Sequence, residues 1–189
     1  PKKVLVSRIR RLFYFIIPNF KFIISGRLSF KNIPGCQQKT LLTGSGVIDI
    51  GKNCSFGYKL GGFHRGGAIE IQPRYKSSEI LIGSNVSTNN NIFICAANYI
   101  EIGDNTLIGQ YVTVMDHEAH GIDPEKRRLI GQIGTVKIKK NVWIGNNVTI
   151  LKNSEIEENT IIAAGAVVSG KFPKNVIIGG IPAKVIKGI

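Results

Sequence analysis

Two of the three histidines in this 189-residue chain lie close together, beside two carboxylates, in one polar segment. The segment runs from residue 115 to residue 135 and contains Asp116, His117, Glu118 and His120. A neutral imidazole is the natural general base near neutral pH. A neighbouring carboxylate can fix its tautomer, although Asp116 and Glu118 could also be a plain exposed acidic pair. The residue types therefore predict a site that removes a proton from a weak nucleophile.

The elements around this segment follow a six-residue rhythm. Isoleucine or valine recurs at every sixth position, at residues 138, 144, 150, 156, 162 and 168. Neither the 3.6-residue period of a helix nor the two-residue period of a flat strand explains this spacing. A strand-and-turn coil with three short faces does, because one aliphatic side chain per face then points to the axis. Such a coil is a solenoid, in which each turn buries its apolar side against its neighbours.

The rhythm divides the chain into three parts. Residues 1–40 precede it, residues 41–172 carry it, and residues 173–189 form a tail after it. The repeated sequences IGKN, IGSN, IGDN and IGNN supply turns, since Gly and Asn tolerate positive φ. Residues 115–135 are the one long interruption late in the coil, and long loops in compact domains are usually functional.

The N-terminal segment is rich in Phe, Ile and Arg, with helical character up to Ile17 and a break at Pro18. Its apolar run is far too short to span a bilayer. Two compatible interpretations remain open. The segment could cap the exposed end of the solenoid. It could also be a basic amphipathic segment that lies on a membrane or a partner.

The composition limits the classes of partner. The net charge of +13 indicates an anionic partner, such as a phosphorylated cofactor, an acidic polymer or a membrane surface. The basic residues are spread along the chain without a nucleic-acid signature, so no nucleic-acid partner is expected. The three cysteines form neither a disulfide framework nor a zinc pattern, and no metal is expected. We see no cleavable signal peptide and expect a cytoplasmic protein, with the inner face of the membrane as a further possibility.

The hexads, the segment AAGAVV and the ending GGIPAKVIKGI resemble the hexapeptide-repeat acyltransferases over residues 80–189. That resemblance implies an all-β fold, a left-handed parallel β-helix. It also implies a homotrimer with active sites at subunit interfaces, and acetyl-CoA as the acyl donor.

The excursion loop is similar to that of the maltose, galactoside, capsule and lipopolysaccharide sugar O-acetyltransferases. The matching positions are His120, Ile122, Asp123, Pro124 and Arg127, while Gly121 stands where the family usually has Pro. The resemblance implies that His120 is the general base and that Arg127 lies near the acceptor. His117 is the rival base within the loop, or else a residue on the substrate side. The partner that orients His120 stays open between Asp116 and Glu118.

The same resemblance implies the remaining site residues. Asn89 would contact the acceptor, with a plain turn residue as the alternative. Trp143 follows the loop in sequence and is expected to pack beside the site, with the core or the trimer interface as the alternative. The predicted coenzyme-binding residues are Asn146, Ala164, Ser169, Lys184 and Lys187. For the two lysines, the alternative is a solubilising tail.

The sequence thus predicts an acetyl-CoA-dependent O-acetyltransferase acting on a sugar hydroxyl, in a surface polysaccharide or its precursor. The acceptor could be a sugar or an anionic polysaccharide. The same scaffold and donor would serve an N-acyltransferase of a nucleotide-linked amino sugar, or an antibiotic acetyltransferase. A metal-dependent hydratase would need three imidazoles around zinc, and the chain offers two in one loop with His64 distant. A non-catalytic β-helix scaffold would bind no coenzyme A.

Overall fold

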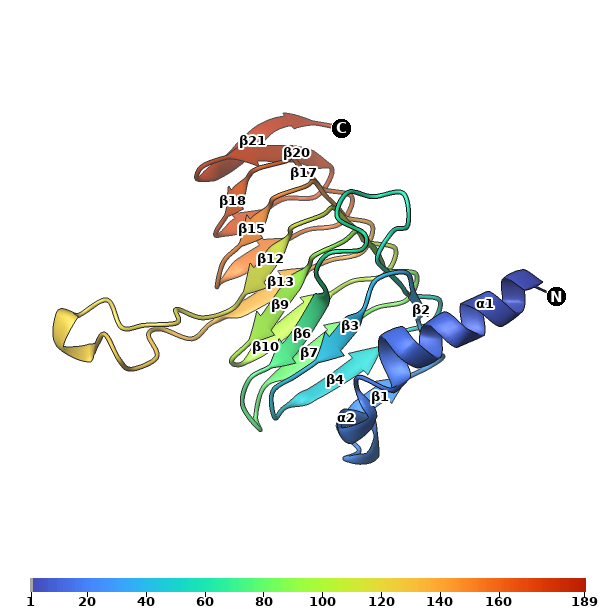
Figure 1. Cartoon of the computed structure of the whole chain (residues 1–189). Coiled ribbons are helices and arrows are strands. Elements are labelled where there is room, and N and C mark those ends of the chain that lie inside the picture. Colours follow the sequence, from blue (N-terminus) through green and yellow to red (C-terminus); the bar gives the residue numbers. More distant parts are fainter. Residues whose placement is uncertain (1) are drawn as a thin grey trace.

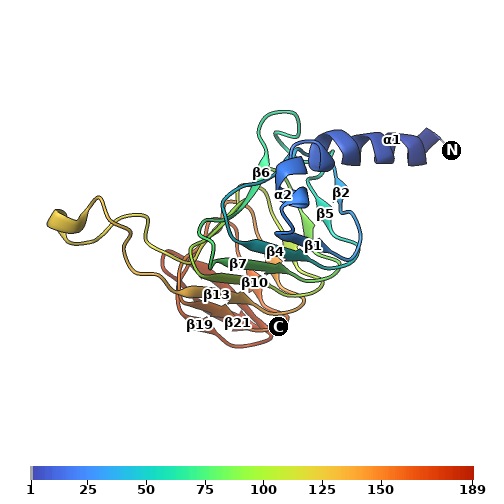
Figure 2. The ribbon, with the colours of Figure 1, turned by 90° about the horizontal axis from the view of Figure 1, so that it is seen from below.

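The computed structural model describes residues 2–189, with side chains from Val4 onward. The chain winds into a triangular coil of three parallel sheets, seen from the side in Figure 1 and along the coil in Figure 2. The first sheet, sheet A, contains β1 (Leu28–Phe30), β4 (Val47–Ile50), β7 (Glu79–Ile82), β10 (Tyr99–Ile102), β13 (Thr135–Ile138), β16 (Ser154–Ile156) and β19 (Lys171–Phe172). Sheet B contains β2 (Gly35–Cys36), β5 (Ser55–Phe56), β8 (Ser87–Thr88), β11 (Leu107–Ile108), β14 (Trp143–Ile144), β17 (Ile161–Ile162), β20 (Val176–Gly180) and β21 (Ala183–Gly188). Sheet C contains β3 (Thr40–Leu42), β6 (Ile69–Pro73), β9 (Phe93–Ala96), β12 (Thr113–Met115), β15 (Thr149–Ile150) and β18 (Val167–Val168).

The six-residue rhythm lines the axis of this coil. The six aliphatic side chains predicted to point inward are each at most 1% exposed, and they are Ile138, Ile144, Ile150, Ile156, Ile162 and Val168. They stack in register, as Ile102, Ile138 and Ile156 do on sheet A. Each inner side chain is therefore covered above and below by its counterpart one coil away. This confirms the coil predicted from the spacing.

One asparagine in each of several coils turns the corner between sheet A and sheet B. Asn85, Asn105, Asn141 and Asn159 all have φ between 58° and 60°, the left-handed region that Asn tolerates. Their side chains form a ladder along the coil: Asn85 Nδ2 donates to Asn105 Oδ1 at 3.0 Å, and Asn141 Nδ2 donates to Asn159 Oδ1 at 2.8 Å. The Asn of each repeat thus sets the turn and ties it to the next.

The N-terminal segment forms α1 (Lys2–Arg11), the π-helical turn η1 (Leu12–Ile16) and α2 (Phe20–Ile24). Phe15 and Phe22 are buried against the first coil, and Phe15 meets Phe30 edge to face. Asn19 bonds the backbone of the first coil, donating to Thr40 O and accepting from Leu42 N. These contacts cover the open end of the stack.

The coil is longer at both ends than the boundaries at residues 41 and 172 predicted from the rhythm. It begins with β1 at Leu28. The spacing did not predict this start, because the first coil lacks the regular hexads of the later coils. It continues through β20, whose Ile178 pairs with Ile162 and is fully buried. The chain then reverses, and β21 adds an antiparallel strand at the edge of sheet B.

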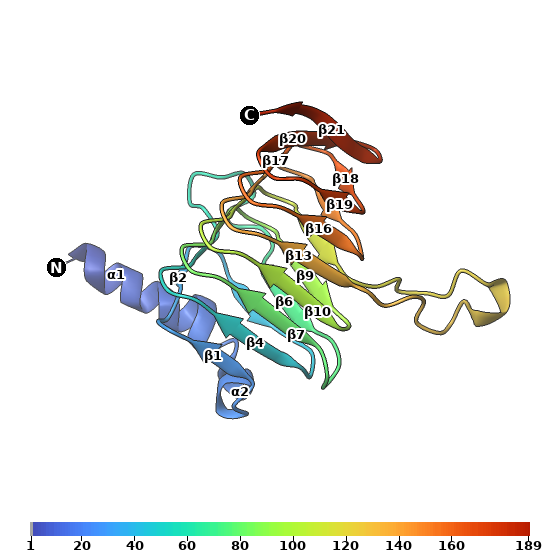
Figure 3. The same cartoon turned by 180° about the vertical axis from the view of Figure 1, so that it is seen from behind.

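Residues 115–135 form an arm between β12 and β13, at the corner between sheets C and A. Figures 1 and 3 show the arm reaching well away from the coil, with the short 3₁₀ turn η2 (Pro124–Lys126) at its tip. Asp123 caps this turn by accepting from Glu125 N at 3.1 Å.

Candidate functional site

The neck of the arm is built on the Asp116 carboxylate, which is completely buried. It accepts three backbone N–H groups of the preceding coil: Ala97 at 2.7 Å, Asn98 at 2.8 Å and Tyr99 at 2.7 Å. Because a buried carboxylate without such donors is costly, these bonds fix where the arm leaves the coil. Asp116 contacts the neighbouring His117 ring rather than His120.

His117 is also part of the neck, and its side chain is completely buried. Its Nδ1 lies 2.9 Å from Asp116 Oδ1, and its Nε2 lies 3.0 Å from Arg74 Nη1. A guanidinium can only donate, so Nε2 accepts from Arg74. Nδ1 then carries the ring proton and donates a hydrogen bond to Asp116. Both ring nitrogens are therefore engaged within the chain.

Beyond the neck, the two sides of the arm run antiparallel. His117 bridges to Ile133, and Glu118 exchanges backbone hydrogen bonds with Gln132 O and Gly131 N. The Glu118 carboxylate accepts from Gln132 N at 3.0 Å and pairs with Lys152 Nζ at 3.3 Å. The Gln132 N–H, and then the Lys152 ammonium, hold the pKa of Glu118 below its ordinary value. Glu118 therefore braces the arm against the coil and makes no hydrogen bond to His120.

His120 lies further out and is exposed. Its Nδ1 is 2.9 Å from the backbone carbonyl oxygen of Arg127, across the arm. A carbonyl oxygen can only accept, so Nδ1 carries the proton and the lone pair of the neutral ring is on Nε2. The Arg127 side chain donates to Ile122 O at 3.1 Å and so tightens the tip. The backbone, rather than either predicted carboxylate, orients this imidazole.

A groove of about 500 Å³ runs over the outer face of sheet B and its corner with sheet C. It brings together three of the predicted site residues, Asn89, Trp143 and Asn146. Trp143 is 55% exposed, so a bulky aromatic surface faces the groove. Asn146 Oδ1 accepts from Gln110 N at 3.0 Å, which fixes the turn at the groove edge.

One wall of the groove comes from the loop between β5 and β6. Asn90, which holds this loop in place, was not predicted from the sequence. Asn90 is fully buried, and its amide accepts from Tyr58 N at 3.0 Å and donates to Tyr58 O and Gly62 O. Tyr58 lines the groove next to Asn89. The run of three asparagines was the available signal, but the sequence could not show what Asn90 binds.

One predicted coenzyme residue, Lys187, lies in line with Trp143 across sheet B. Trp143 pairs in register with Ile161, Ile161 with Ile177, and Ile177 with Lys187. These four side chains therefore form one column on the outer face of sheet B, about 14 Å from first strand to last. The two isoleucines of this column were not predicted, although Ile161 lies one 18-residue coil after Trp143.

The turns beside the column hold two further predicted residues. Asn146 and Ala164 occupy the same corner one coil apart, where Gly165 N donates to Asn146 O at 2.9 Å. Lys184 follows on β21, paired with Gly179. Ser169 lies elsewhere, after β18 and before β19, at the corner between sheets C and A.

A single chain does not bring the arm and the groove together. The arm leaves at the corner between sheets C and A, whereas Asn89 and Asn146 lie at the corner between sheets B and C. Figure 2 shows the arm leaving one side of the triangular section. His120 is thus held on the far side of sheet C from Asn89 and Asn146, whereas Ser169 lies at the same corner as the arm.

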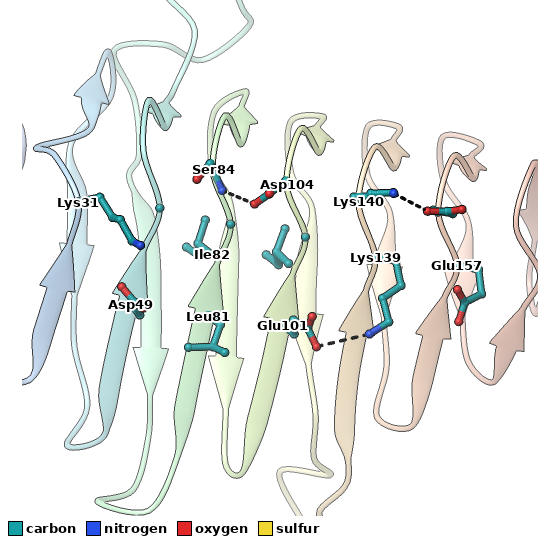
Figure 4. Close-up of a pocket in the computed structure, with 15 residues that line it drawn as sticks. Lys31, Asp49, Leu81, Ile82, Ser84, Glu101, Asp104, Lys139, Lys140 and Glu157 are labelled. Atoms are coloured by element: carbon teal, nitrogen blue, oxygen red, sulfur yellow. Dashed lines mark hydrogen bonds and ion pairs between the residues drawn. The ribbon is translucent and has the colours of Figure 1, made fainter.

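A second groove, of about 540 Å³, lies on sheet A and its corner with sheet B. Figure 4 shows its charged side chains, several of them in opposite-charge pairs. Lys139 Nζ lies 3.7 Å from Glu101 Oε2, and Lys140 Nζ lies 3.1 Å from Glu158 Oε2. None of the predicted site residues lines this groove.

The described part of the chain contains no group of three or more His, Cys, Asp or Glu side chains arranged to hold a metal. All three cysteines are buried and free. Burial raises the pKa of Cys95 to about 11 and that of Cys36 to about 12. The raised pKa values keep Cys36 and Cys95 protonated near neutral pH, so neither is a candidate nucleophile.

Comparison with known proteins identifies the family. The family of bacterial transferases with six hexapeptide repeats matches residues 135–170. WbbJ of Escherichia coli K12, named as an O-acetyl transferase of lipopolysaccharide biosynthesis, is 30% identical over 179 residues, 87% of this chain and 84% of WbbJ. The chain belongs to the hexapeptide-repeat acyltransferases. The resemblance predicted from the hexads is therefore confirmed.

A sequence relative and a solved structure provide two further comparisons. The galactoside O-acetyltransferase of Escherichia coli K12 is 37% identical over 116 residues, covering 59% of this chain and 55% of that enzyme. The crystal structure of the polySia-specific acetyltransferase NeuO superposes with a TM-score of 0.69 at 23% identity, over 85% of this chain and 66% of NeuO. The latter likeness supports the fold, and the predicted left-handed parallel β-helix is confirmed.

Proposed function

We propose that this hexapeptide-repeat acyltransferase is an acetyl-CoA-dependent O-acetyltransferase of a sugar hydroxyl, with His120 as general base. The observation that carries the proposal is the hydrogen bond from His120 Nδ1 to the Arg127 carbonyl. It leaves the basic Nε2 exposed, and among residues 2–189 that nitrogen has no hydrogen-bond partner. His117, in contrast, uses both nitrogens inside the neck.

The chemistry follows from that arrangement. Nε2 of His120 takes the proton of the acceptor hydroxyl while the hydroxyl oxygen attacks the thioester carbonyl of acetyl-CoA. The tetrahedral intermediate collapses, the C–S bond breaks, and the proton passes to the departing thiolate. The Arg127 carbonyl stabilises the protonated ring by accepting from Nδ1, as the third member of a catalytic triad does.

The sheet B column and its corner supply the donor site in this proposal. Trp143, Asn146 and Ala164 would line the pantetheine arm, while Lys184 and Lys187 at the edge of the sheet would attract the phosphates of the coenzyme. Asn89 sits in the same groove on the acceptor side. Lys184 and Lys187 are both exposed, so their charges are free to meet a phosphate.

Because the arm and the groove lie at different corners, the complete site needs two subunits. In the homotrimer that we propose, the arm of one subunit reaches the groove of the next. Mixed oligomers provide a test. His120→Ala chains would be combined with Ala164→Trp chains, in which an indole occupies the corner proposed for the pantetheine arm. Recovery of turnover in the mixture supports a shared site. A mixture as inactive as its two components contradicts it.

For the acceptor, similarity to WbbJ and the charge of +13 favour an anionic surface polysaccharide or its precursor. The expected setting is the cytoplasm, where the basic N-terminal segment would hold the enzyme close to a membrane-bound acceptor. Thioester turnover should be measured against neutral glycans, acidic glycans and nucleotide-linked amino sugars. Preference for an acidic glycan supports the proposal. Turnover confined to the amino group of a nucleotide sugar contradicts it.

A further inference from the structure

The N-terminal segment has two parts, one packed on the coil and one projecting away from it. η1 and α2 are anchored to it by Phe15 and Phe22, which are 0% and 4% exposed. α1 continues past that anchor and projects beyond the side of the coil, as Figures 1 and 3 show. A helix that only capped the stack would not need this projecting part.

The apolar face of α1 is turned outward. Leu5 and Ile9 of α1, with Leu12 and Phe13 of the adjoining η1, follow the i, i+4, i+7, i+8 spacing of one helix face. They are 60%, 48%, 43% and 58% exposed. In an ordinary surface helix of a globular protein, that face packs on the core. Here the face is left for something outside the chain.

Arg10 and Arg11, at the end of α1, meet the coil together with Val6 and Ser7, whereas Arg8 is exposed. Arg10 Nη1 donates to Gln37 Oε1, beside β2. Burial raises the pKa of the Cys36 thiol, and the charge of the nearby Arg11 lowers it in part. Arg11 Nε is buried, and no hydrogen-bond partner for it is found among the described residues. Two of the three arginines of α1 therefore lie against the coil, while Leu5, Ile9 and Arg8 are exposed.

More apolar side chains are exposed where the segment continues. They are Ile17, Phe20 and Ile24, at 53%, 58% and 66% exposure. Exposed apolar surface of this extent on one segment marks an interaction site.

The charge of the segment indicates what the partner is. Residues 1–48 contain nine Lys and Arg and no acidic residue before Asp49, whereas the other 141 residues contain 16 Lys and Arg and 12 Asp and Glu. A second copy of this segment would bring like charge against like charge. An anionic lipid surface offers an apolar layer for the outward face, and negative headgroups for exposed cations such as Arg8 and Lys21.

We propose that α1, with the exposed side chains of η1 and α2, docks the protein on an anionic lipid bilayer. The helix lies in the plane of the interface, with Leu5, Ile9, Leu12 and Phe13 in the acyl boundary. No helix within residues 2–189 is long and apolar enough to cross a membrane. This docking extends the proposed function by naming the surface on which the enzyme works. Lipid binding is measured without turnover, so its failure can be told apart from a failure of the proposed function.

The test is flotation of the full chain with vesicles of phosphatidylcholine alone, or of phosphatidylcholine with about 30% phosphatidylglycerol. The wild type should float with the anionic vesicles, bind weakly to the neutral ones, and lose binding in high salt because the headgroup attraction is screened. The double variant Leu5→Ser/Phe13→Ser should bind the anionic vesicles at least about tenfold more weakly, since two large apolar side chains no longer enter the acyl boundary.

The matched control is Ile186→Ser/Ile189→Ser, on β21 and after it, at the far end of the coil. These two side chains are 61% and 69% exposed, so the control removes similar apolar surface. Its vesicle binding should equal that of the wild type. The proposal is overturned if the wild type ignores anionic vesicles, or if both double variants lose binding equally. It is also overturned if Leu5→Ser/Phe13→Ser changes the oligomer mass in light scattering and leaves lipid binding intact, since a second copy would then cover the face.

Discussion

The neck and the outer part of the arm each hold one histidine, three residues apart, in opposite environments. At the neck, His117 lies between the buried Asp116 carboxylate and Arg74, with both nitrogens engaged. Further out, His120 is exposed and held by one backbone carbonyl. In the mechanism that we propose, the fully bonded imidazole holds the arm in place, while the lightly held one exchanges a proton. Four substitutions test this division.

The largest expected effect is that of His120→Ala. Removing the general base should lower kcat by about 10²–10⁴-fold, while coenzyme A affinity and the unfolding temperature stay unchanged. Thioester turnover, calorimetric titration and thermal unfolding provide the three readouts. The comparison would be reversed if His117→Ala abolished turnover in a fully folded protein while His120→Ala remained active.

Asp116→Ala addresses the neck. The substitution leaves three backbone N–H groups and the His117 ring without their acceptor in a buried place. Each unsatisfied buried donor costs roughly 1–3 kcal/mol, so the free energy of unfolding should fall by about 3 kcal/mol or more. Denaturant titration measures this fall. A loss below about 1 kcal/mol would show that the neck does not depend on this carboxylate.

Gly131→Ala tests whether the backbone of the arm positions His120. A Cβ at Gly131 would meet His120 O at 2.6 Å and Glu118 Oε2 at 2.5 Å, so the two sides of the arm must separate. Misplacing the base in this way should lower kcat by roughly 10- to 100-fold, with a smaller effect on unfolding. The control is Gly66→Ala, whose Cβ would have nothing within 4 Å. Equal activity of the two variants would mean that the arm tolerates the shift.

The smallest effect is expected from Glu118→Gln. Folding lowers the pKa of Glu118, so its ionised form stabilises the native state above the ordinary value of 4.5. That contribution is lost as the pH falls through the lowered folded value. The unfolding temperature of the variant should therefore lie slightly below that of the wild type at pH 7, and the gap should close at acidic pH. A gap that widened on acidification would contradict the assignment.

The coil was readable from the sequence because its cause is local and repeated. An aliphatic side chain at every sixth position must point to the axis, and Ile138 to Val168 are buried as that rule requires. The first and last strands of the coil were not predicted from the sequence, because β1 and β20 belong to coils without regular hexads. No repeat marks where an irregular coil joins a regular one.

The candidate site divides in the same way. The spacing and the family motif selected His120, and the excursion that carries it stood out as a break in the rhythm. The partner of His120 was not readable, because the Arg127 carbonyl is a backbone group and carries no residue type. Asp116 looked like an orienting acid from its position in the sequence, yet its bonds go to the coil below.

By itself, the sequence determined the coil, the place of the arm and the residue types available for acyl transfer. These depend on side-chain periodicity and on chemistry close along the chain. Only the tertiary structure decided which histidine is buried, which strands place Trp143 and Lys187 in one column, and that α1 turns its apolar face outward. These properties arise where segments far apart in the sequence meet, and a one-dimensional pattern does not record such meetings.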